Sequence, residues 1–316
     1  MDIEYIENVS DGAYKEISGF LEKNGIIPEE KPESCVIVRE NGNVTATASL
    51  SGELIKYVAV DFERRGSDLV SALITEIRKR AFGKGRKHLF LVTKPENRAL
   101  FEGLLFGTVA AAESSVLMEY PAGEIDAFLS TVPKMSGEIG AVVMNANPFT
   151  KGHRYLIERA AKECDGVYVF VLSAEKSEFS APERLERVKN GTADLDNVIV
   201  LPTENYLVSE ATFPSYFLRK SVSKNEAFCE LDIAVFGEKF VPALGISKRY
   251  VGTEPYSETT RAYNEALSKA LSDYGTELRV IERLKDENGE AISAGRARRL
   301  LSEGNSAEAE KLIYNI

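Results

Sequence analysis

The fold of this chain is decided by residues 140–162, which read GAVVMNANPFTKGHRYLIERAAK. Gly140 to Met144 is a short apolar run typical of a buried strand, and His153 to Lys162 carries apolar residues at helical spacing. Small and turn-forming residues between the two let the backbone approach a ligand closely. A strand, a tight loop and a helix in this order predict the first βα unit of a parallel sheet, with a ligand site at the helix N-terminus.

The same alternation continues to the end of the chain. A helix is expected from Pro182 to Asn190, and further strands are expected at 166–172, 198–201, 232–236, 249–252 and 279–281. Consecutive βαβ units give a parallel sheet with right-handed crossovers, and ligands bind outside the carboxyl ends of its strands. The fold class is therefore α/β, with a Rossmann-like parallel-sheet domain over residues 138–316.

The first 130 residues show a different, mixed α and β pattern. Helices are expected at 11–23, 67–81 and 95–105, and strands at 35–38, 44–50, 54–60, 88–92 and 115–120. Pro121 to Glu138 reads as a helix followed by a linker, which sets the boundary between two domains. This order resembles the acyltransferase fold of the GNAT superfamily, so a GNAT-like α+β domain is expected over residues 1–130.

The pyrophosphate loop of that superfamily is only partly matched. The corresponding stretch is Glu63-Arg64-Arg65-Gly66-Ser67-Asp68, in which Gly66 alone fits the family pattern. Glu63 and Asp68 would repel a phosphate, and an ordinary helix N-cap explains the stretch as well. The resemblance therefore implies the fold of an acyltransferase without the usual loop that binds the pyrophosphate of coenzyme A.

Composition narrows the class of partner. The formal net charge is −10, which argues against nucleic acid, because binding to a phosphate backbone needs a basic surface. Three scattered cysteines without a CxxC pair indicate neither a disulfide framework nor a zinc site, so no metal ligand is assigned. The same cysteine pattern predicts a reducing, cytoplasmic location. The acidic N-terminus and the absence of a long apolar run predict neither a signal peptide nor a membrane segment.

The loop before the first helix of the parallel sheet has the chemistry of a phosphate site. Gly152 would leave room for a phosphate against the free N–H groups of the helix N-terminus. His153 and Thr150 would add side-chain donors for the charge that builds on an α-phosphate during in-line displacement. The alternative is that His153 only caps a surface helix.

A second segment makes the phosphate site the stronger interpretation. Thr150 to His153 resembles the H/T-x-G-H signature of the nucleotidylyltransferase superfamily, and Ile292 to Arg298 resembles its I-S-x-S-x-x-R signature, with Gly295 in place of the usual Ser. The resemblance implies that Ser293 and the amides of a helix from Arg296 to Leu301 cradle the β- and γ-phosphates, with Arg298 as the charge partner. A capped basic surface helix would explain the second segment alone, but not both signatures in this order.

Several stretches together resemble the citrate lyase ligase family. They are Asn147 to Leu156, Val171 to Ser173, Ser177 to Phe179 with Arg184, Arg249 to Tyr256, and Ile292 to Ala294, joined to the GNAT-like front domain. The resemblance implies an ATP-dependent acid–thiol ligase that activates acetate as acetyl-adenylate. It then acetylates the CoA-derived thiol prosthetic group of the citrate lyase acyl-carrier subunit, and AMP and pyrophosphate are the products.

The resemblance also implies roles for individual residues around ATP and Mg²⁺. The residues expected to act on the reacting groups are Thr150, Lys151, His153 and Arg298. Ser173 and Lys176 are expected to line the pocket, Gly252 and Glu254 to contact the ribose or adenine, and Arg184 either to contact phosphate or to lie on a solvated helix face. The remaining residues expected to bind the nucleotide are Asn145, Asn147, Phe149, Gly152, Ser293 and Gly295.

Two other functions remain open at this point. The chain could transfer a nucleotidyl group to a phosphorylated, phosphopantetheine-like acceptor, or it could be a non-catalytic ATP-binding module. The front domain could recognise the long prosthetic arm or the carrier protein rather than catalyse acyl transfer.

Overall fold

A computed structural model of the chain describes residues 2–66, 68–173, 178–207, 214, 216, 218, 223–253 and 258–314, without the side chains of 225 and 258–263. The chain forms two compact units. Unit 1 comprises Met1–Ala127 and Pro214–Ala227, and unit 2 comprises Phe128–Phe213 and Phe228–Ile316. The functional division into domains 1–130 and 138–316 stays a prediction.

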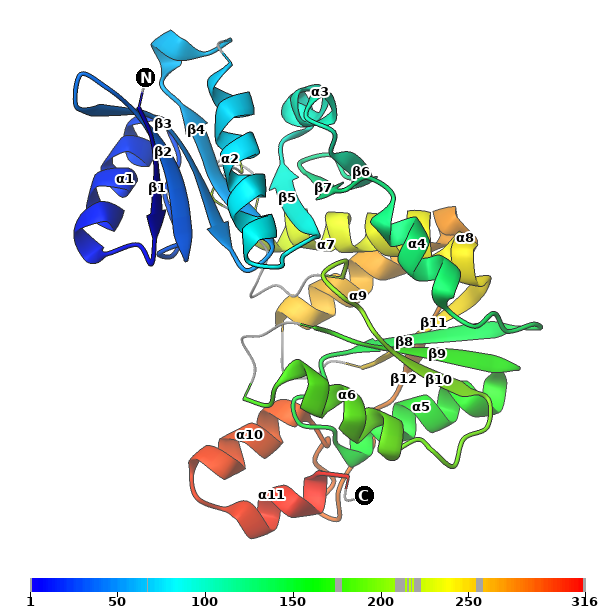
Figure 1. Ribbon diagram of the computed structural model, residues 1–316. Coiled ribbons are helices and arrows are strands. Elements are labelled where there is room, and N and C mark those ends of the chain that lie inside the picture. Colours follow the sequence, from blue (N-terminus) through cyan, green and yellow to red (C-terminus); the bar gives the residue numbers. More distant parts are fainter. Residues whose placement is uncertain are drawn as a thin grey trace. The chain divides into compact units, whose positions relative to one another are not determined.

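Unit 1 is built on a seven-stranded sheet with the strand order β1-β2-β3-β4-β5-β7-β6 (Figure 1). The strands are β1 (Asp2–Glu7), β2 (Ser34–Glu40), β3 (Asn43–Ser51), β4 (Leu54–Val60), β5 (Leu89–Thr93), β6 (Gly107–Ala111) and β7 (Val116–Tyr120). The helices are α1 (Asp11–Lys23), α2 (Leu69–Gly83) and α3 (Arg98–Gly103), with short 3₁₀ turns at Phe62–Arg64 and Pro95–Asn97. Strands β1 and β6 were not predicted from the sequence.

Two apolar clusters hold α1 and α2 against the sheet of unit 1. Helix α2 buries Leu73, Ile74 and Ile77 against strand residues such as Val36 and Leu91, and α1 buries Ile17 and Leu21 in a separate cluster. Burying apolar side chains at these positions is the main term that stabilises such a layered unit.

Strands β4 and β5 pair only at one end. The parallel register runs through Leu54↔Phe90 and Ile55↔Leu91 and goes no further. Beyond it, the N–H of Tyr57 donates to the hydroxyl of Tyr216 over 3.1 Å, and the two rings are 4.7 Å apart. Residue 216 belongs to the segment 214–227 that returns to unit 1, so an aromatic side chain from the later part of the chain occupies the open edge of β4.

Unit 2 contains a five-stranded parallel sheet in the order β10-β9-β8-β11-β12. The strands are β8 (Ile139–Met144), β9 (Gly166–Val171), β10 (Val198–Pro202), β11 (Ile246–Gly252) and β12 (Glu277–Ile281). Figure 1 shows α5 (Lys151–Glu163) and α6 (Ala181–Asn190) on one face of this sheet. The strand order reverses between β9-β8 and β11-β12, and such a switch point is where ligands bind in parallel sheets.

The remaining elements of unit 2 lie around the sheet. Helix α4 (Glu124–Thr131) begins in unit 1 and ends in unit 2, as does α7 (Lys224–Val235). A π-turn at Phe236–Phe240 leads into α8 (Val241–Leu244), α9 (Glu258–Ala270) is followed by a 3₁₀ turn at Leu271–Tyr274, and α10 (Ala294–Ser302) and α11 (Ser306–Leu312) end the chain.

The strand expected at 232–236 is wrong. These residues finish α7 and begin the π-turn, and none of them belongs to the sheet. The run Ile233-Ala234-Val235-Phe236 is buried throughout, so it is apolar on every side and periodicity cannot separate helix from strand. The other strands predicted for this half of the chain are confirmed.

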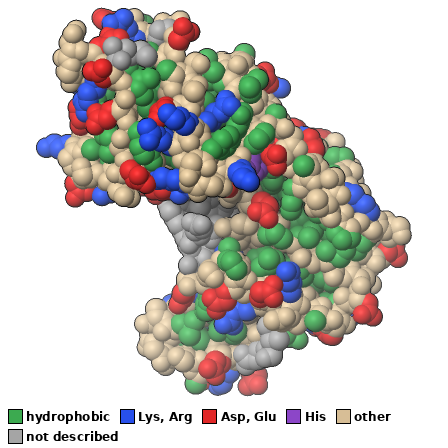
Figure 2. Space-filling view, viewed as in Figure 1, with side chains coloured by type: hydrophobic (Ala, Val, Ile, Leu, Met, Phe, Trp, Pro, Cys, Tyr) green, Lys and Arg blue, Asp and Glu red, His purple; other side chains and the backbone are tan. Residues whose placement is uncertain are grey.

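The α/β fold class is thereby confirmed, with a mainly antiparallel sheet in unit 1 and a parallel sheet in unit 2. Figure 2 shows acidic and basic side chains interspersed over the face that it presents. Within the part of the chain that the structure describes, no helix is both long and apolar enough to cross a membrane.

Candidate active site

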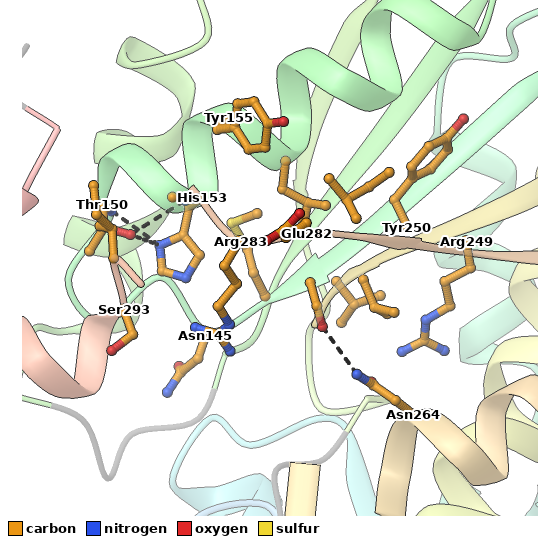
Figure 3. Close-up of a pocket in the computed structure, with 18 residues that line it drawn as sticks. Asn145, Thr150, His153, Tyr155, Arg249, Tyr250, Asn264, Glu282, Arg283 and Ser293 are labelled. Atoms are coloured by element: carbon orange, nitrogen blue, oxygen red, sulfur yellow. Dashed lines mark hydrogen bonds between the residues drawn. The ribbon is translucent and has the colours of Figure 1, made fainter. Parts of the chain in front are cut away.

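A pocket of about 230 Å³ opens where β8, β11 and β12 end (Figure 3). Its wall contains six residues expected from the sequence: Asn145, Thr150, Gly152, His153, Gly252 and Ser293. The two signature segments, although far apart in the chain, therefore meet at one place. The same pocket is lined by three polar residues that the sequence analysis did not single out, namely Asn264, Glu282 and Arg283.

Thr150 and His153 form a reciprocal cap on helix α5. The Thr150 hydroxyl accepts the backbone N–H of His153 at 3.3 Å, and the Thr150 backbone N–H donates to Nδ1 of His153 at 3.1 Å. This is the geometry of a capping box, with a histidine in the place usually taken by Glu or Gln. Because Nδ1 accepts a hydrogen bond, the proton of a neutral ring is on Nε2, which is a donor.

The surroundings of His153 keep its ring neutral. Loss of solvent, followed by the charges of Arg283 and Arg298, lowers the pKa of His153 from 6.5 to about 4. A desolvated site next to positive charges disfavours imidazolium for both reasons. Near pH 7 the side chain is therefore an uncharged Nε2–H donor at the N-terminus of α5, where the backbone amides also favour an anion.

The two signature segments are packed so closely that a side chain at position 152 would not fit. A Cβ added at Gly152 would lie 2.8 Å from the carbonyl oxygen of Ile292. The Arg298 guanidinium also donates to the carbonyl oxygen of Asn147, which ties helix α10 to the loop before α5. Gly152 is thus required by the contact between the two segments, in addition to any need for phosphate to approach.

The end of the chain braces the same loop. Thr150 forms an isolated antiparallel bridge with Ile313, and the N–H of Tyr314 donates to the carbonyl oxygen of Phe149 at 3.1 Å. The Phe149 ring is 1% exposed and packs against both His153 and Tyr314. Phe149 therefore belongs to the core beneath the pocket, and it is absent from the pocket wall.

Ser293 and Gly295 begin helix α10. The Ser293 hydroxyl accepts the N–H of Arg296 at 3.2 Å and caps the helix. Around Gly295, a Cβ would meet only the Arg298 guanidinium, at 3.9 Å. The position therefore has room for the serine that the superfamily signature carries.

Arg184 organises the loops around the pocket instead of lining it. Its side chain is fully buried and donates to Asn145 Oδ1 at 2.6 Å, to the Asn145 and Leu172 carbonyl oxygens at 2.7 Å, and to the Phe179 carbonyl oxygen at 3.1 Å. The Asn147 side chain adds a further tie by accepting the Phe179 N–H at 3.2 Å. Arg184 therefore joins the ends of β8 and β9 to the start of α6, as a positioning residue.

The other expected residues have varied places. Ser173 follows β9 and its N–H donates to the Thr203 hydroxyl at 3.1 Å, away from the pocket wall. Lys151 is exposed in the first turn of α5. Lys176 and Glu254 lie outside the described residues.

Arg283 is the basic residue among the three pocket residues that were not expected from the sequence. It follows β12 in a stretch of mixed charge, Glu282-Arg283-Leu284-Lys285-Asp286, which by itself is typical of a solvated loop. Its place at the carboxyl end of β12, next to β11 in the sheet, could have flagged it, because ligands bind at that edge.

Comparison with known proteins shows the family of this chain. A family model described as the citrate lyase ligase C-terminal domain matches residues 139–316. A [citrate [pro-3S]-lyase] ligase of Escherichia coli K12 is 35% identical over 307 residues, covering 94% of this chain and 87% of that protein. One of Haemophilus influenzae is 37% identical over 306 residues, covering 94% and 91%. This chain belongs to the citrate lyase ligase family.

Proteins of other kinds are similar to parts of the chain. A phosphopantetheine adenylyltransferase of Streptococcus gordonii is 35% identical over 115 residues, covering 35% of the chain and 70% of that protein. Among solved structures, a pantothenate synthetase of Thermus thermophilus covers 58% of the chain and 68% of its own, at 17% identity and a TM-score of 0.38. An acyl-CoA N-acyltransferase of Pseudomonas aeruginosa covers 38% of the chain and 99% of its own, at 12% identity and a TM-score of 0.34.

Proposed function

We propose that this protein is an ATP-dependent ligase that activates acetate as acetyl-adenylate. It then acetylates the thiol of the CoA-derived prosthetic group on the citrate lyase acyl-carrier subunit, releasing AMP and pyrophosphate. The observation that carries the proposal is the neutral His153, held as an Nε2–H donor where the two signature segments meet. Relatives named as ligases, aligned over 94% of the chain, support the same reaction.

In the first step, an oxygen of acetate attacks the α-phosphorus of ATP. The bond from that phosphorus to the bridging oxygen of the β-phosphate breaks, and pyrophosphate leaves with the electron pair. Charge on the α-phosphate oxygens is stabilised by His153 Nε2–H and by the free amides at the start of α5. Ser293, the start of α10 and Arg298 hold the departing pyrophosphate, and the exposed ammonium of Lys151, in the first turn of α5, assists.

In the second step, the carrier thiol attacks the acetyl carbonyl of the adenylate. The carbon–sulfur bond forms, the carbon–oxygen bond to AMP breaks, and the thiol proton is lost to solvent. Acetate itself is a poor acyl donor because its leaving group would be oxide. Adenylation turns that leaving group into a phosphate ester of low basicity, so this step follows readily from the first.

We propose that Mg²⁺ binds to the protein together with ATP, as a complex with its phosphates. Mg²⁺ keeps several waters and takes phosphate oxygens together with one or two carboxylates, and it neutralises charge on the leaving group. Glu282 is the carboxylate in the pocket wall that could reach such an ion. Among the described residues, no group of three His, Cys, Asp or Glu side chains could hold a metal ion.

We propose that unit 1 serves the second step by receiving the prosthetic arm or the carrier protein. The feature that supports this role is the place where β4 and β5 stop pairing, which holds the Tyr216 hydroxyl, from the segment 214–227 that follows β10, as acceptor of the Tyr57 N–H. Tyr216→Phe in the full chain removes the hydroxyl and keeps the ring. We expect acetate-dependent adenylation to be unchanged and carrier acetylation to change in rate, and equal rates for both would count against the role.

The decisive test of the function is exchange of labelled pyrophosphate into ATP. A ligase performs the exchange only when acetate is present, because the adenylate must form and revert. A nucleotidylyltransferase would need a phosphorylated acceptor instead, for which 4′-phosphopantetheine is the probe. A non-catalytic module would show ATP binding with neither exchange, and a panel of short carboxylic acids would define the acid.

A further inference from the structure

Arg283 lies outside both signature segments but inside the pocket that they form. It lies on the loop after β12 and lines the pocket together with His153 and Asn145. Figure 3 shows its side chain running into the pocket beside the ring of His153. We propose that Arg283 is a further catalytic residue, whose guanidinium binds the α-phosphate of ATP together with His153 and stabilises the charge formed there.

The position of Arg283 is fixed by Thr253, the residue that follows β11. Its Nε donates to the Thr253 carbonyl oxygen at 2.5 Å, and its backbone N–H donates to the Thr253 hydroxyl at 3.2 Å. Gly252 lies next to its side chain, since a Cβ at 252 would be 3.6 Å from Arg283 Cγ. A guanidinium held through Nε keeps a fixed orientation. The entropy cost of ordering the long Arg283 side chain is therefore met on folding, and substrate binding does not add to it.

The electrostatics of the pocket support the same assignment. After the loss of solvent, the charge of Arg283 is the next largest cause that lowers the pKa of His153, ahead of the charge of Arg298. Arg298 belongs to α10 and donates to the Asn147 carbonyl oxygen. The charges of the two arginines thus act on the histidine from different segments. A planar guanidinium with several N–H donors suits a phosphate better than an ammonium does.

This inference rests on the proposed function, because it concerns the same adenylation step. When the acid oxygen bonds to the α-phosphorus and pyrophosphate leaves, the non-bridging α-oxygens gain hydrogen-bond acceptor strength. Arg283 and His153 Nε2–H donate to them, and no proton is transferred because the attacking acid is already a carboxylate. Interactions that strengthen only in the transition state raise kcat and leave substrate binding almost unchanged.

The test compares Arg283→Gln and Arg283→Lys with a matched control in acetate-dependent pyrophosphate exchange. The control is Arg279→Gln, which changes an exposed arginine on β12 that pairs with Glu277 outside the pocket. We expect kcat to fall about 100-fold in Arg283→Gln, about 10-fold in Arg283→Lys and not at all in the control, in line with loss of one transition-state donor. KM for ATP should stay within about three-fold in all of them, as expected for an interaction confined to the transition state.

A pH profile separates a catalytic from a structural role. Removing the charge in Arg283→Gln should move the acid limb of kcat/KM to higher pH, while Arg283→Lys keeps it in place. A raised KM with unchanged kcat, or an unmoved acid limb, would overturn the inference and assign Arg283 to ground-state binding or to the loop alone. Absence of acetate-dependent exchange in the unmodified protein would instead reject the proposed function, so the two failures are distinguishable.

Discussion

The backbone N–H of Thr150 donates to Nδ1 of His153 over 3.1 Å, and this bond sets the tautomer of the ring. The same ring is stacked on Phe149, which is buried beneath it, so its plane is set as well. A donor whose proton and orientation are both fixed before substrate arrives needs no reorganisation during the reaction. The cap of helix α5 therefore also fixes the donor that we propose for catalysis.

His153→Ala should lower kcat of acetate-dependent exchange by about 100- to 1,000-fold, the usual effect of losing one transition-state donor. KM for ATP should change little. The matched control is His88→Gln, because the chain's other histidine pairs with Glu119 in unit 1 at 3.0 Å. Equal losses in the two variants would show that the effect is structural.

The acid limb of the pH profile of kcat/KM should lie well below neutral pH. The pKa of His153 is lowered to about 4, so kcat/KM should rise with pH around that value and be flat from about pH 5.5 to 8 as far as this group is concerned. An ordinary histidine would place the limb near its reference pKa of about 6.5. The pH dependence of kcat/KM, which reports pKa values of the free enzyme, distinguishes a limb near pH 4 from one near pH 6.5. The His153→Gln variant is measured in parallel.

The same shift has a consequence for stability. A histidine whose folded pKa is depressed binds more protons when unfolded, so it stabilises the fold fully above about pH 6.5 and loses this contribution as pH falls toward 4. The free energy of unfolding should therefore decline through this window by up to about 1.4 kcal/mol per pH unit from this group. The slope should be smaller in His153→Gln, as measured by denaturant unfolding at a series of pH values.

The sequence was most informative where one local pattern leads to one local structure. The loop from Asn145 to His153 was expected between a strand and a helix because both neighbours show clear periodicity, and it lies there. The helix at 232–236 could not be told from a strand, since its residues are buried on all sides. Contacts between residues far apart in the chain are a second limit on prediction from sequence. Residue spacing predicts neither the four hydrogen-bond acceptors of Arg184 nor the effect of the Arg283 charge on His153.

Gly152→Ala should damage the contact between the two signature segments. The added Cβ would lie 2.8 Å from the Ile292 carbonyl oxygen. That oxygen is a backbone atom and the Cβ is bonded directly to the backbone, so no side-chain rotation relieves the contact. We expect a loss of about 1–3 kcal/mol in the free energy of unfolding and a large fall in exchange activity. Gly295→Ala is the control, because its Cβ would meet only the tip of Arg298 at 3.9 Å. Similar thermal stability of the two variants would contradict the close packing.

Arg184→Met should destabilise unit 2 by more than its matched control does. The substitution leaves the carbonyl oxygens of Asn145 and Leu172 without their donor in a buried place, at a cost of about 3 kcal/mol. Arg187→Met on the same helix removes an exposed ion pair with Glu183 and a cation–π contact with the Phe179 ring, which together are worth about 1 kcal/mol. If Arg184 instead contacted phosphate, its loss would raise KM for ATP with unchanged unfolding midpoint, and chemical denaturation beside exchange kinetics separates the two.

Gly295→Ser should improve ATP binding, because it restores the serine that the I-S-x-S-x-x-R signature has at this position. The position is in the first turn of α10, where a Cβ finds open space, and an added hydroxyl would supply one more donor toward the phosphates. One hydrogen bond to a charged group is worth about 1.5 kcal/mol, so KM for ATP should fall about ten-fold at most. Gly295→Ala separates the hydroxyl from the loss of glycine's flexibility, because it changes the backbone entropy equally and adds no donor. Equal KM values for the serine and alanine variants would show that the triphosphate does not reach position 295.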